Sequence, residues 1–449
     1  MHAKFILNPK RHIMDICRLK SILILSGILF FPCISFHLPS HAGEIYLHTV
    51  YDDGFSLKSK APEGPELKIG GLFQADYRYY SEEQRADNRF DIRRSRLIFS
   101  GKQSHWLNFR MEYEFQGKES DNLNTAYGEI NFGRQSVRMG QFKEPFSLEW
   151  QSTNRTLFFA ERSTAYSLSP KRDMGLMISG CFFRDKILYS AGLFNGDGTD
   201  GSSAGNEHDE PEVAVRTVVI PFKASSTRWL SSFQTGFSGT YAKIDTLNVN
   251  LNVKSPGMAG TQHSIYELTH NTKFGVLQNV EDRIRMGLET AWSYGPLAIQ
   301  GELVKLTYRG LEPAGSPSED ADFISWYAGA SLCLTGEKPF YSGGVPAEIT
   351  PQTNFDPENG GTGALCLAVR LDHFTGDKDW INPASSVSVE VSDGISLALT
   401  WILNPFSSII FDFSHTEFSD DVRVRVLPDG GIDYIDKENV LTSRFQLHF

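Results

Sequence analysis

Residues Leu107–Phe115 read LNFRMEYEF, and this stretch decides the fold class. Its apolar residues occupy every second position, and the positions between them carry an asparagine, an arginine and two glutamates. Side chains of a β-strand point alternately to opposite faces, so the stretch predicts a strand with one apolar and one charged face.

The same alternation recurs along the whole chain. It is found in FQADYRYY (73–80), SFQTGFSGTY (232–241), RIRMGLETAW (283–292), ISWYAGASLCLT (324–335), SLALTWIL (396–403) and LTSRFQLHF (441–449). A soluble β-sandwich also alternates, with its apolar face turned inward. Here the polar faces carry many full charges, and the strands run to about nine to twelve residues, which is long for a sandwich.

The connections between the expected strands alternate in length, which favours a barrel that spans a membrane. Short connections fall near 101–105, 133–135, 184–185, 294–296 and 404–406. Long ones fall near 81–89, 117–124, 143–173, 195–212, 243–282, 310–322, 375–394 and 417–439. Short turns on one rim and long loops on the other are typical of bacterial outer-membrane barrels. Hydrocarbon solvates no backbone amides, so a closed barrel satisfies them where an open sheet cannot.

We therefore predict an all-β transmembrane antiparallel barrel of about sixteen strands. The expected strands begin near residues 67, 90, 105, 125, 135, 174, 186, 213, 231, 283, 297, 323, 364, 395, 407 and 440. Residues 336–363 fall where a short turn is expected, so either this turn is long or the count slips there. SVSVEV (386–391) is either an extra strand or part of a loop.

The N-terminus resembles a secretory signal. Basic residues precede the apolar run SILILSGILFFPCISF (21–36), and Ser40-His41-Ala42 offers a cleavage site before Gly43. A single membrane anchor is the alternative. The expected organisation is a signal peptide at 1–42, a short lead-in at 43–66 and the barrel at 67–449. The formal net charge of −11 argues against generic nucleic-acid binding.

Several segments resemble, in order, the phosphate- and pyrophosphate-selective O/P family of outer-membrane porins. They are FDIRRSRLIFSGK (90–102), VRMGQFKEPFSLEW (137–150), FFAERSTAYSLSPKRDMGLMISG (158–180), GALCLAVRLDHFTGD (363–377), LTWILNPFSSIIFDFSHTEF (399–418) and LTSRFQLHF (441–449). Residues 195–282 show little that can be matched. The resemblance implies a sixteen-stranded homotrimeric barrel in the bacterial outer membrane, surrounded by lipid, that passes small anions such as phosphate. The C-terminal Phe449 resembles the signal read by the outer-membrane assembly machinery.

Arginines on the charged strand faces are the candidate anion-binding residues of the channel wall, because a guanidinium group binds phosphate oxygens at two points. They are Arg94, Arg96, Arg110, Arg138, Arg216, Arg283, Arg285, Arg370 and Arg444. The alternative is that these arginines pair with lumen carboxylates and stiffen the wall; the candidate partners are Asp76, Glu112, Glu114, Glu129, Glu289 and Asp372. Arg93 falls on the opposite face, so we expect it near a rim or in a bulge, unless the register of this strand is reversed.

The third long connection, within Met139–Gly175, is expected to fold into the barrel and narrow the pore. Its aromatic residues can pack against the wall, while Lys143, Arg155, Arg162, Lys171 and Arg172 face the water passage. The counter-charges would be Glu144, Glu149, Glu161 and Asp173. We predict that neutralising Arg162 and Lys171 together lowers anion preference. The alternative is that Glu161 and Arg162 pair locally and only shape the loop.

Cys333 and Cys366 share lumen parity, and each lies close to the expected long turn 336–363. Opposite positions on antiparallel strands would allow a disulfide that staples this turn; two free thiols are the alternative. No sequence signature of a zinc site or serine nucleophile occurs. We therefore expect no reaction and no cofactor. The predicted function is passive diffusion of small anions, phosphate or pyrophosphate among them. The alternatives are a general porin without anion preference, an outer-membrane barrel enzyme and a soluble extracellular β-protein.

Overall fold

The computed structural model describes most of the chain beyond the N-terminal segment. The described residues are 47–51, 54–59, 61, 63–81, 86–116, 122–196, 210–244, 249–261, 263–269, 271–381, 387–426 and 431–449. The predicted signal peptide, residues 1–42, lies outside them.

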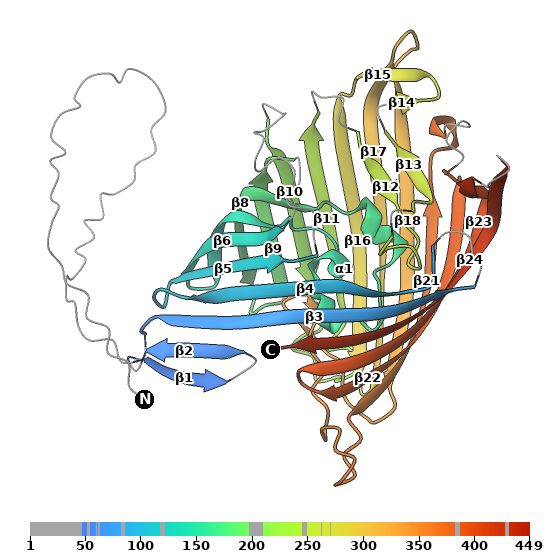
Figure 1. Cartoon of the computed structure of the whole chain (residues 1–449). Helices are drawn as coiled ribbons and strands as arrows, with labels where there is room; N and C mark the ends of the chain where they lie inside the picture. Colours follow the sequence, from blue (N-terminus) through green and yellow to red (C-terminus); the bar gives the residue numbers. More distant parts are fainter. Residues whose placement is uncertain are drawn as a thin grey trace, which may run out of the picture. The chain divides into compact units, whose positions relative to one another are not determined.

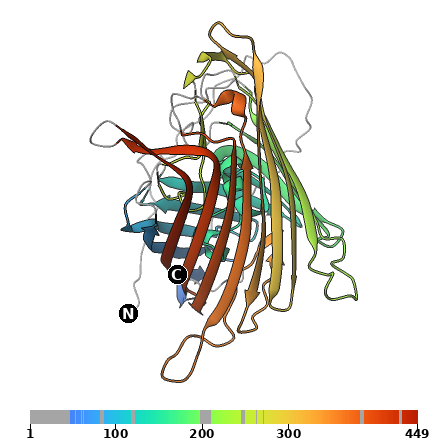
Figure 2. The same cartoon turned by 90° about the vertical axis from the view of Figure 1, so that its right-hand side faces the viewer.

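Sixteen strands of the described residues form one closed antiparallel barrel (Figures 1 and 2). Each pairs with its neighbours in chain order, and the last strand pairs with the first, which closes the ring. In chain order they are β3 (Glu66–Tyr80), β4 (Arg89–Lys102), β5 (Leu107–Glu114), β6 (Leu123–Phe132), β7 (Gln135–Lys143), β8 (Arg172–Phe182), β9 (Ile187–Phe194), β10 (Glu212–Val219), β11 (Gln234–Lys243), β16 (Asp282–Tyr294), β17 (Leu297–Pro313), β18 (Glu319–Cys333), β21 (Ala364–Thr375), β22 (Val391–Asn404), β23 (Ser407–Val426) and β24 (Ile432–His448).

This architecture confirms the predicted fold and strand count. The observed strands begin within four residues of the predicted positions, except for β24, which begins at Ile432 rather than near 440. The segment SVSVEV does not form an extra strand in its described part: 387–390 is irregular, and Val391 begins β22.

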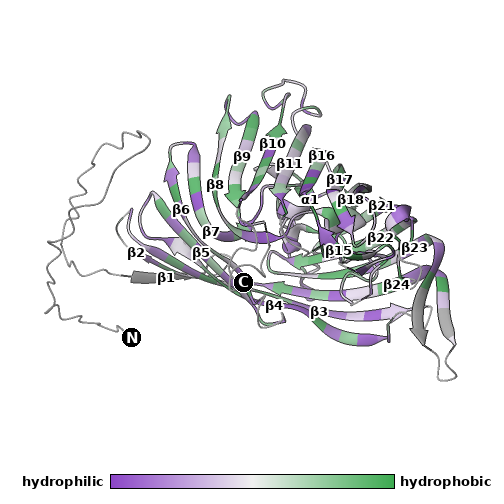
Figure 3. Ribbon diagram, turned by 90° about the horizontal axis from the view of Figure 1, so that it is seen from above, coloured by the Kyte–Doolittle hydropathy of each residue, from purple (hydrophilic) through white to green (hydrophobic). Residues whose placement is uncertain are grey.

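The two faces of each strand differ as the alternation predicts, and Figure 3 shows hydrophobic and hydrophilic residues alternating along the ribbons. On β24, Phe445 and Leu447 are exposed on the outer face, whereas Arg444 and Gln446 are buried on the lumen face. On β5, Met111 is exposed and Glu112 is buried. The apolar faces therefore point outward and the charged faces point into the barrel, the reverse of a soluble sandwich.

Arg93 occupies a β-bulge in β4. Gln74 of β3 pairs with Arg94, and the next residue of β3, Ala75, pairs with Ile92, so Arg93 is an extra residue without a register partner. One extra residue reverses the parity of a strand. Arg93 and Arg94 consequently both reach lumen groups, which is the bulge alternative that the sequence left open.

The connections follow the predicted alternation with two exceptions on the short-turn rim. Residues 220–233 and 334–363 are both long there, and the latter, called the long turn, contains β19 (Tyr341–Ser342) and β20 (Val345–Pro346). In Figure 1 part of the long turn projects from the lower end of the barrel. The register places Cys333 opposite Cys366, and a disulfide joins the two sulfurs at the base of this turn.

The lead-in before the barrel carries two short strands, β1 (Leu47–Tyr51) and β2 (Phe55–Ser59). β2 pairs with the first residues of β3, on the same edge that β24 pairs with farther along. Phe449 lies between them and exchanges backbone hydrogen bonds with Gly71. Gly71 leaves room for the terminal ring, because a Cβ there would lie 2.6 Å from it.

Two long loops, called the third loop (144–171) and the fifth loop (244–281), pack against each other inside the barrel. The third loop contains α1 (Leu148–Gln151), which lies inside the ring of strands in Figure 3, and the short 3-10 helices η2 (Asn154–Thr156) and η3 (Thr164–Leu168). The fifth loop contains β12 (Leu251–Val253), β13 (Tyr266–Leu268), β14 (Asn271–Thr272) and β15 (Gly275–Asn279).

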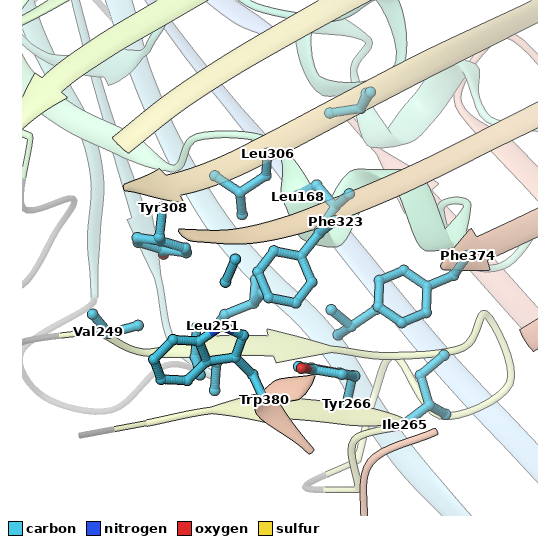
Figure 4. Close-up of a cluster of buried hydrophobic side chains, with 14 of the residues drawn as sticks. Leu168, Val249, Leu251, Ile265, Tyr266, Leu306, Tyr308, Phe323, Phe374 and Trp380 are labelled. Atoms are coloured by element: carbon cyan, nitrogen blue, oxygen red, sulfur yellow. The ribbon is translucent and has the colours of Figure 1, made fainter. Parts of the chain in front are cut away.

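The largest cluster of buried apolar side chains joins the fifth loop to the lumen face of the barrel (Figure 4). Leu251 and Tyr266 of the β12–β13 hairpin pack with Tyr308 of β17 and Phe323 of β18, and η3 adds Leu168. A second contributor is the connection that follows β21, through its 3-10 helix η5 (Lys378–Trp380). This side of the lumen is therefore filled by apolar groups. None of the helices in the described ranges has the length and apolar character that a membrane-crossing helix requires.

Candidate functional site

A buried carboxylate on the opposite wall of the barrel binds the first part of the third loop. Glu302 of β17 accepts hydrogen bonds from the backbone N–H groups of Leu148 (3.0 Å) and Glu149 (2.6 Å) and from the hydroxyl of Ser147. The Tyr327 hydroxyl donates a further bond to it at 2.8 Å. Because a carboxylate satisfies the free donors of a helix N-terminus, Glu302 holds α1 at the β17 wall.

Beyond α1, the loop crosses the lumen and contacts the strands that close the barrel. The backbone N–H of Ala160 donates to Asp412 of β23 at 2.7 Å, and that of Thr164 donates to Asp372 of β21 at 3.0 Å. The Arg370 guanidinium donates to the carbonyl of Glu161 at 3.0 Å. The loop is therefore anchored at both walls and crosses the lumen.

Glu161, at the far side of the loop, contacts four arginines from the neighbouring strands β24, β3 and β4. Arg78 Nη2 and Arg93 Nε each lie 2.6 Å from Glu161 Oε1, Arg444 Nη2 lies 2.9 Å from the same oxygen, and Arg94 Nη2 lies 3.9 Å from Oε2. Burial alone would raise the pKa of Glu161, but these guanidinium groups hold it well below its ordinary value. The carboxylate therefore stays charged at neutral pH.

Among the described ion pairs of these four arginines, the other carboxylate is that of Asp76. Asp76 of β3 is bonded to Arg78 at 2.9 Å and to Arg444 at 2.7 Å. Arg94 donates to Gln74 at 2.7 Å rather than to a carboxylate. Four guanidinium groups thus face two carboxylates, which leaves an excess of positive charge at this point of the lumen.

A cavity of about 260 Å³, called the arginine cavity, lies beside this group. The charged residues that line it are Arg93, Arg94, Glu161, Arg162, Lys171 and Lys254. The fifth loop forms part of its wall, where Lys254 donates a backbone hydrogen bond to Ser167 and Arg93 reaches the carbonyl of Ala259. Burial lowers the pKa of Lys254, and the charge of Arg93 lowers it further.

A second group of candidate arginines surrounds Glu112 of β5. Arg96 Nη1 lies 2.9 Å from its Oε1, Arg110 Nη2 lies 3.1 Å from its Oε2, and Arg172 Nη2 lies 3.8 Å away. Arg96 also bonds Glu114 at 2.6 Å. The structure therefore brings three predicted site residues together, with three cations for two carboxylates.

A third group surrounds Glu212 of β10. Arg283 Nη2 lies 2.6 Å and Arg285 Nη1 lies 3.0 Å from its two carboxylate oxygens. Arg285 also donates to the carbonyl of Leu168, so it supports the third loop. Arg283 and Arg285, both predicted site residues, therefore share one carboxylate.

Lumen arginines also pair with carboxylates of the wall, which is the alternative that the sequence left open. Each of the six predicted carboxylate partners contacts an arginine: Asp76–Arg444, Glu112–Arg96, Glu114–Arg96, Glu129–Arg138, Glu289–Arg216 and Asp372–Arg370. Wall stiffening and excess positive charge therefore coexist, because several carboxylates serve more than one arginine.

The predicted loop cations occupy two different environments. Lys143 donates to the carbonyls of Trp150 (2.6 Å) and Ser152 (2.9 Å), and Arg162 donates to the carbonyls of Glu149 (3.1 Å) and Ser152 (2.8 Å). Both side chains thus shape the loop. Arg162 donates to loop carbonyls, and the Glu161–Arg162 pair that the sequence left as an alternative is absent from the described ion pairs. Glu161 contacts Arg93 instead.

Lys171 is the exposed cation of the loop. Its side chain lines the arginine cavity and makes no hydrogen bond or ion pair with other described residues. Arg155 lies on the opposite side of the loop, where its guanidinium is 2.8 Å from Glu348 of the long turn.

The long turn also folds back into the barrel. The carbonyl of Gly344 accepts hydrogen bonds from Arg216 (2.9 Å) and Gln234 (3.3 Å) on the lumen face, and the Tyr341 hydroxyl bonds Gln300 at 3.2 Å. Two inward-folded segments, the third loop and the long turn, therefore lie one behind the other in the lumen.

The sequence comparisons decide the family. Residues 67–449 match the family described as "Phosphate-selective porin O and P". The chain belongs to this family. The porin is therefore a channel protein of the bacterial outer membrane, and its short-turn rim is the periplasmic one. It is 22% identical over 402 residues to Porin O of Pseudomonas aeruginosa, which covers 81% of this chain and 87% of that protein.

Solved structures share the fold. An anion-selective porin from Comamonas acidovorans superposes with a TM-score of 0.51 at 11% identity, covering 86% of this porin and 100% of that chain. The outer-membrane channel DcaP of Acinetobacter baumannii superposes with a TM-score of 0.52 at 10% identity, covering 88% and 99%. At these identities the likeness shows a common barrel architecture.

Sequence reasoning missed several residues of the arginine cavity. Lys254 and Asn252 come from the fifth loop, in the part of the chain that shows little resemblance to the family segments. Arg78, which contacts Glu161 but does not line the cavity, had the correct parity in FQADYRYY, but nothing in that strand indicates a contact with residue 161. Among the described residues, no three His, Cys, Asp or Glu side chains gather as a metal site would require.

Proposed function

We propose that this porin passes small anions by passive diffusion and that phosphate or pyrophosphate is among them. One observation carries the proposal: the arginine cavity presents five cationic side chains and one carboxylate to a space of about 260 Å³ at the third loop. Fixed charge at a constriction selects permeating ions, and guanidinium groups fit phosphate oxygens in pairs.

The cations divide into anchored and mobile ones. Arg93 and Arg94 are held at fixed positions by Glu161 and Gln74, so their remaining donors are preorganised for an oxyanion. Lys171, by contrast, is an exposed point charge on a flexible stem. An anion would first meet lysine and then arginine, with little reorganisation of the wall. The family description and the name of the anion-selective relative agree with this proposal.

Passage down a gradient breaks no covalent bond, so the porin would act as a channel without a cofactor. The family membership implies a channel rather than an enzyme. No described constellation favours the barrel-enzyme alternative.

A general porin without anion preference is the second candidate. The observation that favours it is the extensive pairing of lumen arginines, since Arg216 and Arg370 each bond a carboxylate within 2.8 Å. If that pairing neutralises the whole passage, width alone would decide which solutes cross.

The reversal potential across a planar lipid bilayer in a potassium chloride gradient separates the two candidates. We expect a potential of the sign that chloride selectivity produces, and a fall in chloride conductance when inorganic phosphate is added. A potential near zero would support the general porin, and a cation-selective potential would remove the anion proposal. The Arg94→Gln variant should weaken the phosphate block, whereas Lys437→Gln, an exposed residue of β24, should leave it unchanged.

The partners predicted from the sequence remain proposals. The outward apolar side chains suit a lipid environment, and the family resemblance implies a homotrimer. Phe449, packed beside Phe55 at the end of β24, is the proposed recognition point for the assembly machinery. Chemical cross-linking of outer membranes checks the trimer, and the amount of Phe449→Ala variant in that fraction checks the assembly signal. Monomer alone, or unchanged variant levels, would contradict the respective proposal.

A further inference from the structure

A second cavity lies on the periplasmic side of the third loop, between that loop and the long turn. Its volume is about 90 Å³, several times the roughly 10–15 Å³ that one water molecule needs. The lumen faces of β17, β18, β22, β23 and β24 complete the wall through residues such as Gln300, Thr400 and Gln446. We call this space the aromatic chamber.

The walls of the chamber are mostly apolar. The third loop contributes Phe158 and Phe159, and the long turn contributes Phe340 and Ile349, all of which keep part of their surface uncovered. The Phe340 side chain is 53% exposed. Aromatic rings left uncovered inside an aqueous passage indicate a surface that a solute can cover.

The chamber and the arginine cavity lie back to back across the third loop. Arg370 lines the chamber and donates to the carbonyls of Glu161 and Arg162, which line the arginine cavity. Its guanidinium also lies 4.4 Å from the centre of the Phe159 ring. One layer of loop therefore separates a cationic space from an aromatic one.

The charged side chains at the edge of the chamber contact one another. Arg155 and Glu348 join its two sides at 2.8 Å, and His448 Nε2 lies 3.7 Å from Glu348. Glu149 is directed away toward Ser163. The apolar rings therefore supply most of the surface that a solute would meet here.

We propose that the aromatic chamber binds the apolar body of an organic phosphate monoester whose phosphate group is selected by the arginine cavity. The inference rests on the proposed anion channel and narrows its substrate to esters that carry an aromatic group. Inorganic phosphate can use only the first space, whereas such an ester can use both in succession. Coverage of the rings by the ester should lengthen its stay in the channel.

The test compares two phosphate monoesters of equal charge that differ only in their apolar part. The mature protein is inserted in a planar bilayer, and the chloride current is titrated with methyl phosphate and with phenyl phosphate on both sides. We expect phenyl phosphate to halve the current at about a tenfold lower concentration, the effect of removing roughly 50–60 Å² of apolar surface from water.

Substitutions in the long turn test whether the chamber causes the preference for phenyl phosphate over methyl phosphate. Phe340→Ser should bring the ratio of the two half-blocking concentrations close to one while leaving the block by methyl phosphate unchanged. Phe355→Ser is the matched control, because this ring belongs to the same turn, packs on Trp401 and does not line the chamber. Ile349→Ser provides a second lesion on the chamber side.

The outcomes separate this inference from the proposed function. Equal block by both esters in the native protein, or the same ratio in Phe340→Ser and native protein, would overturn the chamber while leaving the anion channel. Block by phenyl phosphate without block by methyl or inorganic phosphate would support the chamber and remove the phosphate preference. If neither ester reduces the current, both the chamber and the proposed phosphate preference of the channel are contradicted.

Discussion

Arg93 lies in a bulge of β4, and its guanidinium is 2.6 Å from the carboxylate of Glu161 in the third loop. The bulge turns two consecutive arginines toward the lumen, which a regular strand cannot do. The third loop is thereby tied to the β3–β4 wall as well as to β21 and β23. A local irregularity of the barrel thus helps to position the third loop.

The Glu161→Gln substitution should destabilise the barrel and raise its anion preference. Four guanidinium groups would lose their common counter-charge, and breaking a buried ion pair from one side costs about 3–5 kcal/mol. Urea titration in lipid, followed by heat-modifiable gel mobility, measures the free energy of unfolding, and the reversal potential measures preference. Glu417→Gln, an exposed carboxylate on β23, is the control. A Glu161→Gln protein as stable as the control would contradict the proposed central role.

Lys171, the exposed lysine that lines the arginine cavity, should contribute to selectivity without stabilising the fold. We expect Lys171→Gln to lower the anion preference with a change in unfolding free energy within about 0.5 kcal/mol, typical of surface positions. Arg162→Gln should mainly destabilise the loop, because its guanidinium bonds loop carbonyls. The double variant should then combine both effects. Reversal potentials and urea midpoints of the three proteins check this, and unchanged selectivity after loss of Lys171 would place the filter elsewhere.

Glu144, the first residue of the third loop, should make the stability depend on pH. Burial, followed by repulsion from Glu212, raises the pKa of Glu144 well above its ordinary value. The folded protein then keeps a proton that the unfolded chain releases above about pH 4.3, so this group lowers stability as pH rises from there through its folded pKa.

The Glu144→Gln variant carries no such proton. We expect it to match the native protein near pH 4 and to exceed it near pH 7, by about 1.4 kcal/mol for each unit of the pKa shift. Urea midpoints at several pH values give the difference. Glu358→Gln, an exposed carboxylate of the long turn, should show no pH-dependent gain. A constant difference at all pH values would show that Glu144 is ionised in the folded barrel.

The disulfide should restrain the long turn. Cys333 and Cys366 are separated by 33 positions in sequence, and closing a loop of such length stabilises a protein by about 3–4 kcal/mol in the chain-entropy model. We expect the double alanine variant to be less stable by up to this amount and its long turn to be cut faster by protease. Native protein under reducing conditions should show the same loss of stability and the same faster cleavage of the long turn. Thiol labelling of denatured protein that is identical with and without reductant would show that the bond does not form.

The membrane-facing part of the fold was predictable because lipid imposes an apolar outer face on every strand. Beyond the membrane this constraint ends: Glu417 and Lys437 pair across β23 and β24 with both side chains exposed. Strand pairing continues there without alternation in hydrophobicity. The alternation therefore does not indicate the extensions of β23 and β24 beyond the membrane. For this reason the predicted start of β24, near residue 440, lies after the observed start at Ile432.

The candidate site was predictable in its residue types but not in its contacts. Parity placed Arg94, Arg285 and Arg444 in the lumen, because a strand has only two faces. Their partners depend on where the third and fifth loops cross the barrel, and those paths come from contacts between residues far apart in sequence. Lys254 belongs to such a loop, so no local pattern indicated its place beside Arg93.

The first strand of the barrel, β3, pairs with β2 and β24 along one edge. β24 covers β3 from Tyr80 to Leu72, β2 covers it from Ile69 to Glu66, and Phe449 fills the place between them. The seam of the barrel is thus a three-part joint whose middle piece is the final residue of the chain. Loss of Phe449 would leave a gap in this joint, so closure of the barrel depends on this residue as well as on the pairing of β24 with β3.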